Sequence, residues 1–264
     1  METSSNFLKI AKVAALEASP IALKYFNKKI KITNKGTTSK NDWVTLADIN
    51  TEKKIVNYLV KHFPKHNIEL EEANSIRNSS DYTWYIDPIS NTYNFIRGLG
   101  HFGIIISLYY KNKPLVAVTF DPYYNELFWA QKGKGAWGNK AKARLRVSKI
   151  NKLSQALGIL RLEPKAPKEE IDRYLKIFSK ISKQILENRF FGSNPLHLAY
   201  LAAGKFDFYI NNRVDPRSHA AGYLIVKEAG GKMTDIKGKE WQIGENTVIA
   251  SNNILHSQLL SFLK

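Results

Sequence analysis

Hydrophobic positions recur at helical spacing in several segments of the chain. Residues 6–30 carry apolar side chains three and four positions apart, which predicts an N-terminal amphipathic helix. A second helix is expected after Thr45, with Asp48 and Glu52 near its start. Further helices are expected near residues 168–182, 196–203, 220–228 and 255–263.

From His101 onward, short apolar runs alternate with turn residues, which predicts a meander of strands. These runs are residues 102–110, 114–121, 126–131 and 136–137, and later strands are expected at 206–210 and 247–251. A short buried strand over 82–86 is expected to end at Asp87, because Pro88 cannot donate a ladder hydrogen bond. The polar stretch 31–40 predicts a loop or a short hairpin.

Helices and strands alternate along all 264 residues without a linker, an internal repeat or a low-complexity tract. This order predicts an α/β (α+β) fold in one unit spanning residues 1–264. The alternative is two sub-domains that share an interface, approximately 1–140 and 141–264; the family resemblance given below implies that the first holds metal and phosphate and that the second faces the substrate.

The composition removes several classes of protein. The chain has no cysteine, which excludes disulfides, thiolate metal sites and cysteine nucleophiles, so any metal must be held by oxygen or imidazole. No apolar run approaches the roughly 18 residues of a membrane helix, and the N-terminus lacks the pattern of a secretory signal. We therefore expect a soluble, cytoplasmic protein without a membrane partner.

The chain is strongly basic, with 40 Lys and Arg against 23 Asp and Glu and a net charge of +17. The lysines are scattered and form no basic block with interleaved aromatic residues. The charge is typical of a lysine-rich surface, and it also fits steering of an anionic ligand such as a phosphate ester. No specific nucleic-acid partner is expected.

Candidate chemistry gathers around the strand that ends at Asp87. The pair Asn91-Thr92 opens a predicted helix, whose free N–H groups can hold an anion. Glu71 and Glu72 precede the same strand, and carboxylates beside an anion site are typical of hard-cation binding next to a phosphate. The alternative is that Asp87 and Thr92 only cap a turn.

The order of these motifs resembles the inositol monophosphatase family over nearly the whole chain. The first motif of that family is matched by Asp42, Val44, Thr45 and Asp48, and the second in part by Glu71-Glu72. Residues 84–95 and 217–231 match the two longer motifs, with exceptions, and the segment 192–207 is similar to the substrate side of the family.

The resemblance implies a layered αβαβα sandwich, a homodimer, and magnesium-dependent, lithium-sensitive hydrolysis of small phosphate monoesters such as inositol or sugar phosphates. It implies one cation held by Glu71, Asp87 and the carbonyl of Ile89. Thr92 and Asp48 match the residues that orient the attacking water, and the amides of Asn91 and Thr92 would hold phosphate.

The exceptions fall where this chemistry takes place. Leu70 and Asn91 replace glycines, Ser90 and Ser218 replace aspartates, and Arg217 replaces a tryptophan of the family pattern. A second cation would keep only Asp87, and magnesium is poorly held by a single carboxylate. We expect at most one well-formed Mg²⁺ site and strongly reduced hydrolysis. The alternative is a non-catalytic or engineered relative that binds phosphate or another anionic ligand, or serves as a scaffold.

Two further readings concern residues 217–219. Arg217 could bind phosphate together with Ser90 or Ser218, or it could pair with Asp215 or turn to solvent. Ser218 and His219 could form a nucleophile and its base, but adjacent helical residues are expected to point in different directions.

Overall fold

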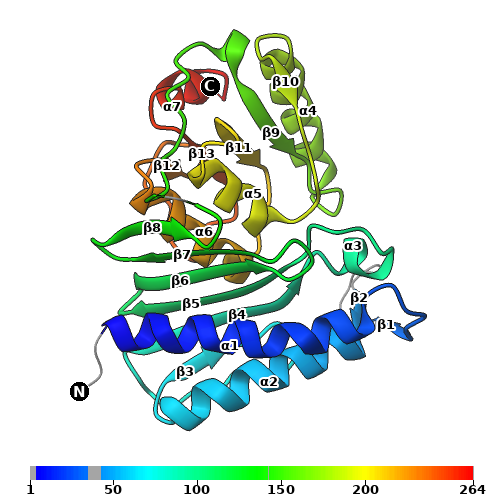
Figure 1. The fold of residues 1–264 in the computed structure, drawn as a ribbon. Helices are drawn as coiled ribbons and strands as arrows, with labels where there is room; N and C mark the ends of the chain where they lie inside the picture. The colour runs from blue at the N-terminus through cyan, green and yellow to red at the C-terminus, as the bar shows by residue number, and fades with distance from the viewer. Residues whose placement is uncertain (1–3, 35–42, 142, 264) are drawn as a thin grey trace.

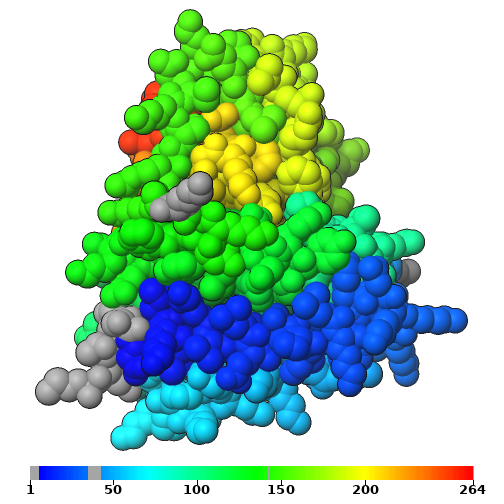
Figure 2. Space-filling view, in the orientation of Figure 1, coloured from blue at the N-terminus to red at the C-terminus, as the bar shows by residue number. Residues whose placement is uncertain are grey.

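The computed structural model describes residues 4–34, 43–141 and 143–263. Its first layer consists of two long helices, α1 (Ser4–Tyr25) and α2 (Leu46–His62), which cover one face of a six-stranded sheet (Figure 1). Their apolar sides meet Trp84, Ile86 and Ile104 of that sheet in one buried cluster. In the space-filling view, α1 runs beneath the green part of the chain across the width of the molecule (Figure 2).

The six-stranded sheet forms the second layer. Its strands are β3 (Asn67–Glu69), β4 (Tyr82–Ser90), β5 (Gly103–Tyr110), β6 (Lys113–Asp121), β7 (Glu126–Gln131) and β8 (Gly135–Gly138), in that spatial order. Neighbouring strands from β4 to β8 pair antiparallel, and β3 pairs parallel to β4. The predicted meander is therefore confirmed.

Two helices separate this sheet from a second one. Helices α5 (Asn194–Ala202) and α6 (Pro216–Glu228) are buried over most of their length, as expected of helices that are covered on all sides. They form one cluster with residues of both sheets, including Ile105, Ala117, Tyr209 and Val248.

The second sheet has the order β10 (Glu187–Asn188), β9 (Leu157–Arg161), β11 (Phe208–Asn211), β13 (Val248–Ser251) and β12 (Lys232–Thr234). Side chains of α4 (Lys168–Ser182) and α7 (His256–Ser261) pack on its outer face. The layers follow the order αβαβα, as the resemblance implied (Figure 1). The small elements are β1 (Ile32–Asn34), β2 (Trp43–Thr45), α3 (Thr92–Ile96) and a 3₁₀ turn at Leu153–Gln155.

Several predicted boundaries were wrong. The strand expected to stop at Asp87 continues through Pro88 to Ser90, because its pairing with β5 shifts register between Asp87 and Ser90 and leaves no ladder bond for the proline to donate. The N-terminal helix ends at Tyr25, and α6 begins at Pro216, where the proline suits the first helical turn. Strands β3, β9 and β12 are too short to give a clear periodic signal.

The polar stretch 31–40, predicted to be a loop or a short hairpin, is described only as far as Asn34, where β1 pairs antiparallel with β2 beyond the stretch. The residues between these strands, with Asp42 of the first motif, lie outside the described residues. No helix in the described ranges is long and apolar enough to cross a membrane.

Candidate active site

The predicted site residues meet at a cavity of about 240 Å³ at the Ser90 end of β4. The cavity lies where the segment after β3, the start of α3, the end of β9 and the start of α6 converge. Its lining includes Glu71, Asp87, Ser90, Asn91, Thr92 and Ser218 from the predicted set. Asp48 lies behind Thr92 and is fully buried, while Leu70 and Arg217 lie beside the cavity and are not part of its lining.

The turn from β4 into α3 explains one of the replaced glycines. Asn91 has φ +68°, in the left-handed region, and its side chain caps α3 by accepting from the backbone N–H of Asn94. Asparagine tolerates this conformation better than most residues. Gly192 packs against this turn, since a Cβ there would lie 2.1 Å from Asn91 Nδ2 and its own φ is +100°. Asn91 can therefore occupy a left-handed position that glycine also adopts readily.

Thr92 and Asp48 are brought together as the resemblance implied. Thr92 Oγ1 lies 3.2 Å from Asp48 Oδ1 and 3.3 Å from the carbonyl oxygen of Ile89. The other carboxylate oxygen of Asp48 accepts from Thr45 N at 2.8 Å and Thr45 Oγ1 at 2.6 Å, which completes a capping box at the start of α2. Asp48 is thus held rigidly, and the Thr92 hydroxyl is oriented by it.

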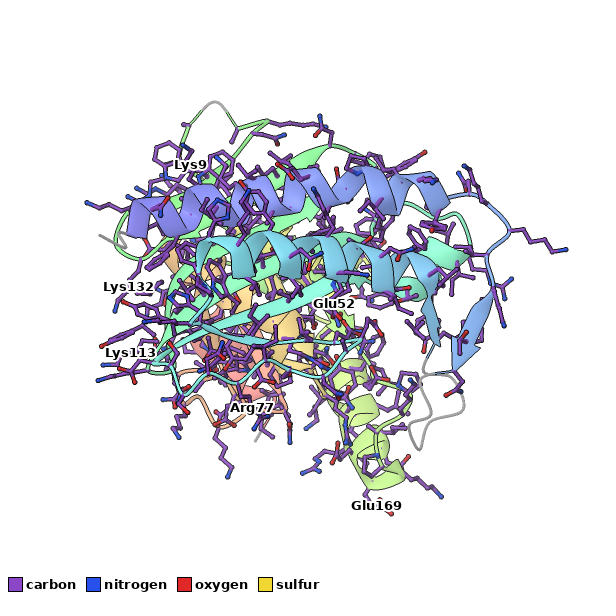
Figure 3. The ribbon with its side chains drawn as sticks, turned by 90° about the horizontal axis from the view of Figure 1, so that it is seen from below. Lys9, Glu52, Arg77, Lys113, Lys132 and Glu169 are labelled. Carbon is purple, nitrogen blue, oxygen red and sulfur yellow. The ribbon has the colours of Figure 1, made fainter. Side chains whose placement is uncertain are left out.

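Glu71 is positioned by a buried glutamate of α2. Glu52 Oε2 accepts from the backbone N–H of Glu71 at 3.0 Å and of Glu72 at 2.9 Å. Glu52 is 3% exposed, and Figure 3 shows it in the interior, between α2 and the strands. Glu52 therefore fixes the segment that carries Glu71 at the cavity.

The donor set fits one hard cation. Glu71 and Asp87 line the same cavity, and Ile89 turns its carbonyl toward Thr92. In the part of the chain that the structure describes, no three His, Asp or Glu side chains gather as a metal-binding group. Two carboxylates and a carbonyl suit one Mg²⁺ that keeps several waters, and a second ion would find hydroxyls at Ser90 and Ser218.

Arg217 pairs with Asp215, which is one of the arrangements that the sequence left open. Its Nη2 lies 2.6 Å from Asp215 Oδ2 and its Nε 3.1 Å from Oδ1, while Nη1 donates to the carbonyl oxygen of Leu70 at 2.7 Å. Burial disfavours its charge, yet the hydrogen bonds and attraction of Asp215, with Glu71 and Asp87 nearby, raise the pKa of Arg217 further above its usual range. Its donors are engaged within the protein, so phosphate binding by Arg217 stays a prediction that this geometry does not favour.

Asp215 serves both the helix and the ion pair. It caps α6 by accepting from the backbone N–H of Arg217 at 2.8 Å. Although burial favours the neutral acid, the hydrogen bonds and charge of Arg217 hold the pKa of Asp215 below its usual value. Leu70 replaces a glycine of the family pattern. Its side chain packs in the buried cluster between the first two helices and the six-stranded sheet, and its carbonyl oxygen accepts a hydrogen bond from Arg217.

Ser218 and His219 do touch, contrary to the expectation that neighbours on a helix point apart. Ser218 Oγ lies 3.2 Å from His219 Nδ1, because both turn back to the carbonyl oxygen of Asp215. That carbonyl can only accept, so Nδ1 carries the proton that donates to it at 2.9 Å. His219 therefore has no lone pair on Nδ1 to accept the Ser218 proton, and the pair is not a nucleophile with its base.

Three basic side chains at the cavity were missed by the sequence reasoning. Arg161 ends β9, Lys165 follows it, and Arg213 follows β11, and all three line the cavity. Arg161 forms an ion pair with Glu163 at 2.7 Å. No local motif marks these residues; only the parallel pairing of β9 with β11 brings their strand ends together.

Comparisons with known proteins agree over nearly the whole chain. The profile of the inositol monophosphatase family matches residues 3–263. A fructose-1,6-bisphosphatase/inositol-1-monophosphatase of Aquifex aeolicus is 31% identical over 264 residues, covering 100% of this chain and 97% of the relative. The Nus factor SuhB of Escherichia coli is 35% identical over 248 residues, covering 93% and 91%.

Solved structures of named relatives are also similar to this chain over nearly its whole length. An inositol monophosphatase (IMPase) of Thermotoga maritima superposes with a TM-score of 0.87 and 31% identity, covering 98% of this chain and 96% of that one. The extragenic suppressor protein suhB of Bartonella henselae gives 0.91 and 29%, with 98% of both chains covered. The chain belongs to the inositol monophosphatase family.

Proposed function

We propose that the cavity binds a small phosphate monoester and hydrolyses it slowly, with a single Mg²⁺ held by Glu71, Asp87 and the carbonyl of Ile89. The observation that carries this proposal is the sharing of one cavity by carboxylates, the Thr92 hydroxyl and three basic side chains. A bound Mg²⁺ would neutralise phosphate charge.

The chain's own residues account for the orientation of water. When the Thr92 hydroxyl donates to Asp48, its oxygen is left to accept a hydrogen bond from a water molecule. Asp48 holds this direction because Thr45 occupies its second oxygen. Water oriented in this way would attack the phosphorus of a bound ester. The bond between phosphorus and the ester oxygen would break, and inorganic phosphate and the alcohol would leave, with the alcohol taking up a proton that the water gives up.

Arg161, Lys165 and Arg213 favour an anionic substrate, and the polar cavity of about 240 Å³ suits a small hydroxylated alcohol. Several relatives are named inositol monophosphatases or fructose-1,6-bisphosphatase/inositol-1-monophosphatases. The substrate class is therefore a phosphate ester of an inositol or a sugar.

Slow hydrolysis follows from the residues at the leaving side. Ser90 and Ser218 offer hydroxyls where two carboxylates would be needed for a second cation. Losing one of two cations costs several kcal/mol of transition-state stabilisation, on the order of a thousandfold in rate.

A second candidate function is binding without catalysis. It is favoured by the serines at the cavity, and several relatives are named Nus factor SuhB rather than by an enzymatic activity. In this case the cavity would still hold a phosphate or another anion, but without turnover.

A homodimer is also part of the proposal. Large apolar side chains gather on the surface beside the cavity, where His101 lies between the rings of Tyr124 and Phe191 at centroid distances of 4.8 Å. Leu99, Tyr123 and Phe190 are each at least half exposed in the same region. Exposed apolar patches of this kind are typical of subunit contacts.

The test combines magnesium calorimetry with phosphate release from a panel of phosphate monoesters. Wild type should bind one Mg²⁺ and release phosphate slowly. The variant S90D/S218D should bind magnesium more tightly and release phosphate faster by up to about a thousandfold. The matched control S179D/S257D adds the same charge on exposed positions of α4 and α7 and should change neither quantity.

Family-like turnover in wild type would overturn the proposed slow hydrolysis. Phosphate binding without release in wild type and in S90D/S218D would favour the non-catalytic function.

A further inference from the structure

A second cavity lies far from the candidate active site. It has a volume of about 580 Å³ and lies between the β5–β6 turn, the β7–β8 turn and the C-terminal end of α6. Tyr110 at this end of β5 pairs with Tyr82, whereas Ser90 at the other end of β4 pairs with Gly103. Eight residues of strand separate the two ends, a distance of about 26 Å. The cavity is therefore independent of the first one.

Four lysines surround this cavity from three separate segments of the chain. Lys111 and Lys113 come from the β5–β6 turn, Lys132 from the β7–β8 turn, and Lys227 from α6. Figure 3 shows Lys113 and Lys132 projecting outward on the same side of the molecule. Like charges brought together by the fold repel each other, so their convergence here indicates a negatively charged ligand.

The nearby acidic groups neutralise only part of this charge. The Glu228 carboxylate accepts from the backbone N–H groups of Gly133 and Gly135, at 2.7 Å each. Glu240 pairs with Lys227, and Asp81 pairs with Lys111 at 3.3 Å. Within the described ranges, Lys113 and Lys132 have no ion-pair partner, and both are exposed at the rim.

The wall of the cavity includes a buried hydrogen-bond donor. Trp241 is fully buried in the wall, and its Nε1 has no hydrogen-bond partner among the described residues. The β5–β6 turn places Lys111 at φ +47°, a conformation that lysine seldom adopts.

We propose that this cavity binds a small molecule carrying two or more phosphate groups. A concave site of about 580 Å³ is in the size range of small-molecule pockets. The lysines come from three separate segments around the cavity, so two or more of them can contact separate phosphates of one ligand. Nucleic acid would need a longer basic track than these rims provide.

The experiment measures binding of inorganic pyrophosphate, tripolyphosphate and monophosphate to the whole protein by calorimetry. Tripolyphosphate should bind most tightly and monophosphate weakly. The variant K113A/K132A should weaken tripolyphosphate binding by about tenfold or more. The matched control K176A/K180A removes the same charge from exposed positions of α4 and should bind as wild type does.

The variant R213A separates this cavity from the candidate active site. Tripolyphosphate affinity should be retained in R213A and lost in K113A/K132A. Equal weakening in K113A/K132A and K176A/K180A would mean that binding follows diffuse surface charge, and loss in R213A alone would place the ligand in the active site. Either outcome would overturn the proposal without bearing on phosphate release from monoesters.

Discussion

The two sides of the candidate active-site cavity differ in how closely they match the family motifs. On the α2 side, Thr45, Asp48 and Thr92 form a closed hydrogen-bond network that matches the family pattern. On the α6 side, Arg217 and Ser218 depart from it, and an ion pair with Asp215 stands at the helix start. In the proposed mechanism the α2 side orients water and the α6 side would hold the second cation, so the two properties can change separately.

The largest expected loss of stability comes from disrupting the hydrogen-bond network on the α2 side. Asp48→Ala removes a fully buried carboxylate that accepts from Thr45 and Thr92, and it should lower the free energy of unfolding by about 3–4 kcal/mol. Urea denaturation measures this, and any phosphate release should disappear. A destabilisation below 1 kcal/mol would show that the network contributes little to the fold.

Acid should destabilise the protein by a similar amount through His219, which lies in α6. Burial lowers the pKa of His219 to about 4, whereas an unfolded histidine titrates near 6.5. The unfolded state then binds more protons between these values, so stability is constant above pH 6.5 and falls as pH drops toward 4, by on the order of 3 kcal/mol from this residue. Denaturation midpoints measured across this range should fall less steeply in His219→Gln, and identical profiles would contradict the prediction.

Removing the α6 ion pair should have a moderate effect. Arg217→Ala leaves Asp215 and the Leu70 carbonyl without their shared donor, which should cost about 1–3 kcal/mol. Arg217→Lys keeps the charge but loses the two-pronged contact, and it should recover only part of the stability. Full recovery by lysine would mean that charge alone matters here.

The smallest effect on stability is expected at Thr92. Thr92→Val removes one hydrogen bond to Asp48 while preserving the shape of the side chain, and it should cost about 1 kcal/mol of stability. The rate of phosphate release should fall strongly although the stability changes little, because the hydroxyl orients water in the proposed mechanism. A matched Thr92→Ser variant should retain most of the release rate.

The sequence predicted the fold well where patterns are long and local. The meander from β5 to β8 was predicted from short apolar runs separated by turn residues, and helix α4 was predicted over the range that the structure shows. The end of β4 was not, because the register shift that lets the strand pass Pro88 depends on its partner β5.

The order of the motifs identified four candidate site residues in the sequence: Asp48, Glu71, Asp87 and Thr92. The structure places these residues in or directly behind one cavity. Arg161, Lys165 and Arg213 could not be found in this way. They are isolated basic residues in a chain with 40 of them, and only the pairing of β9 and β11 makes them neighbours.

The link from Arg217 to the Leu70 carbonyl has a consequence for how a cationic group is held beside the cavity. A dissolved cation occupies a site only in proportion to its free concentration, and a chelator removes it. A guanidinium attached to α6 arrives when the helix forms and is present in every folded molecule, at any magnesium level. On this side of the cavity, the electrostatic potential is set by folding itself.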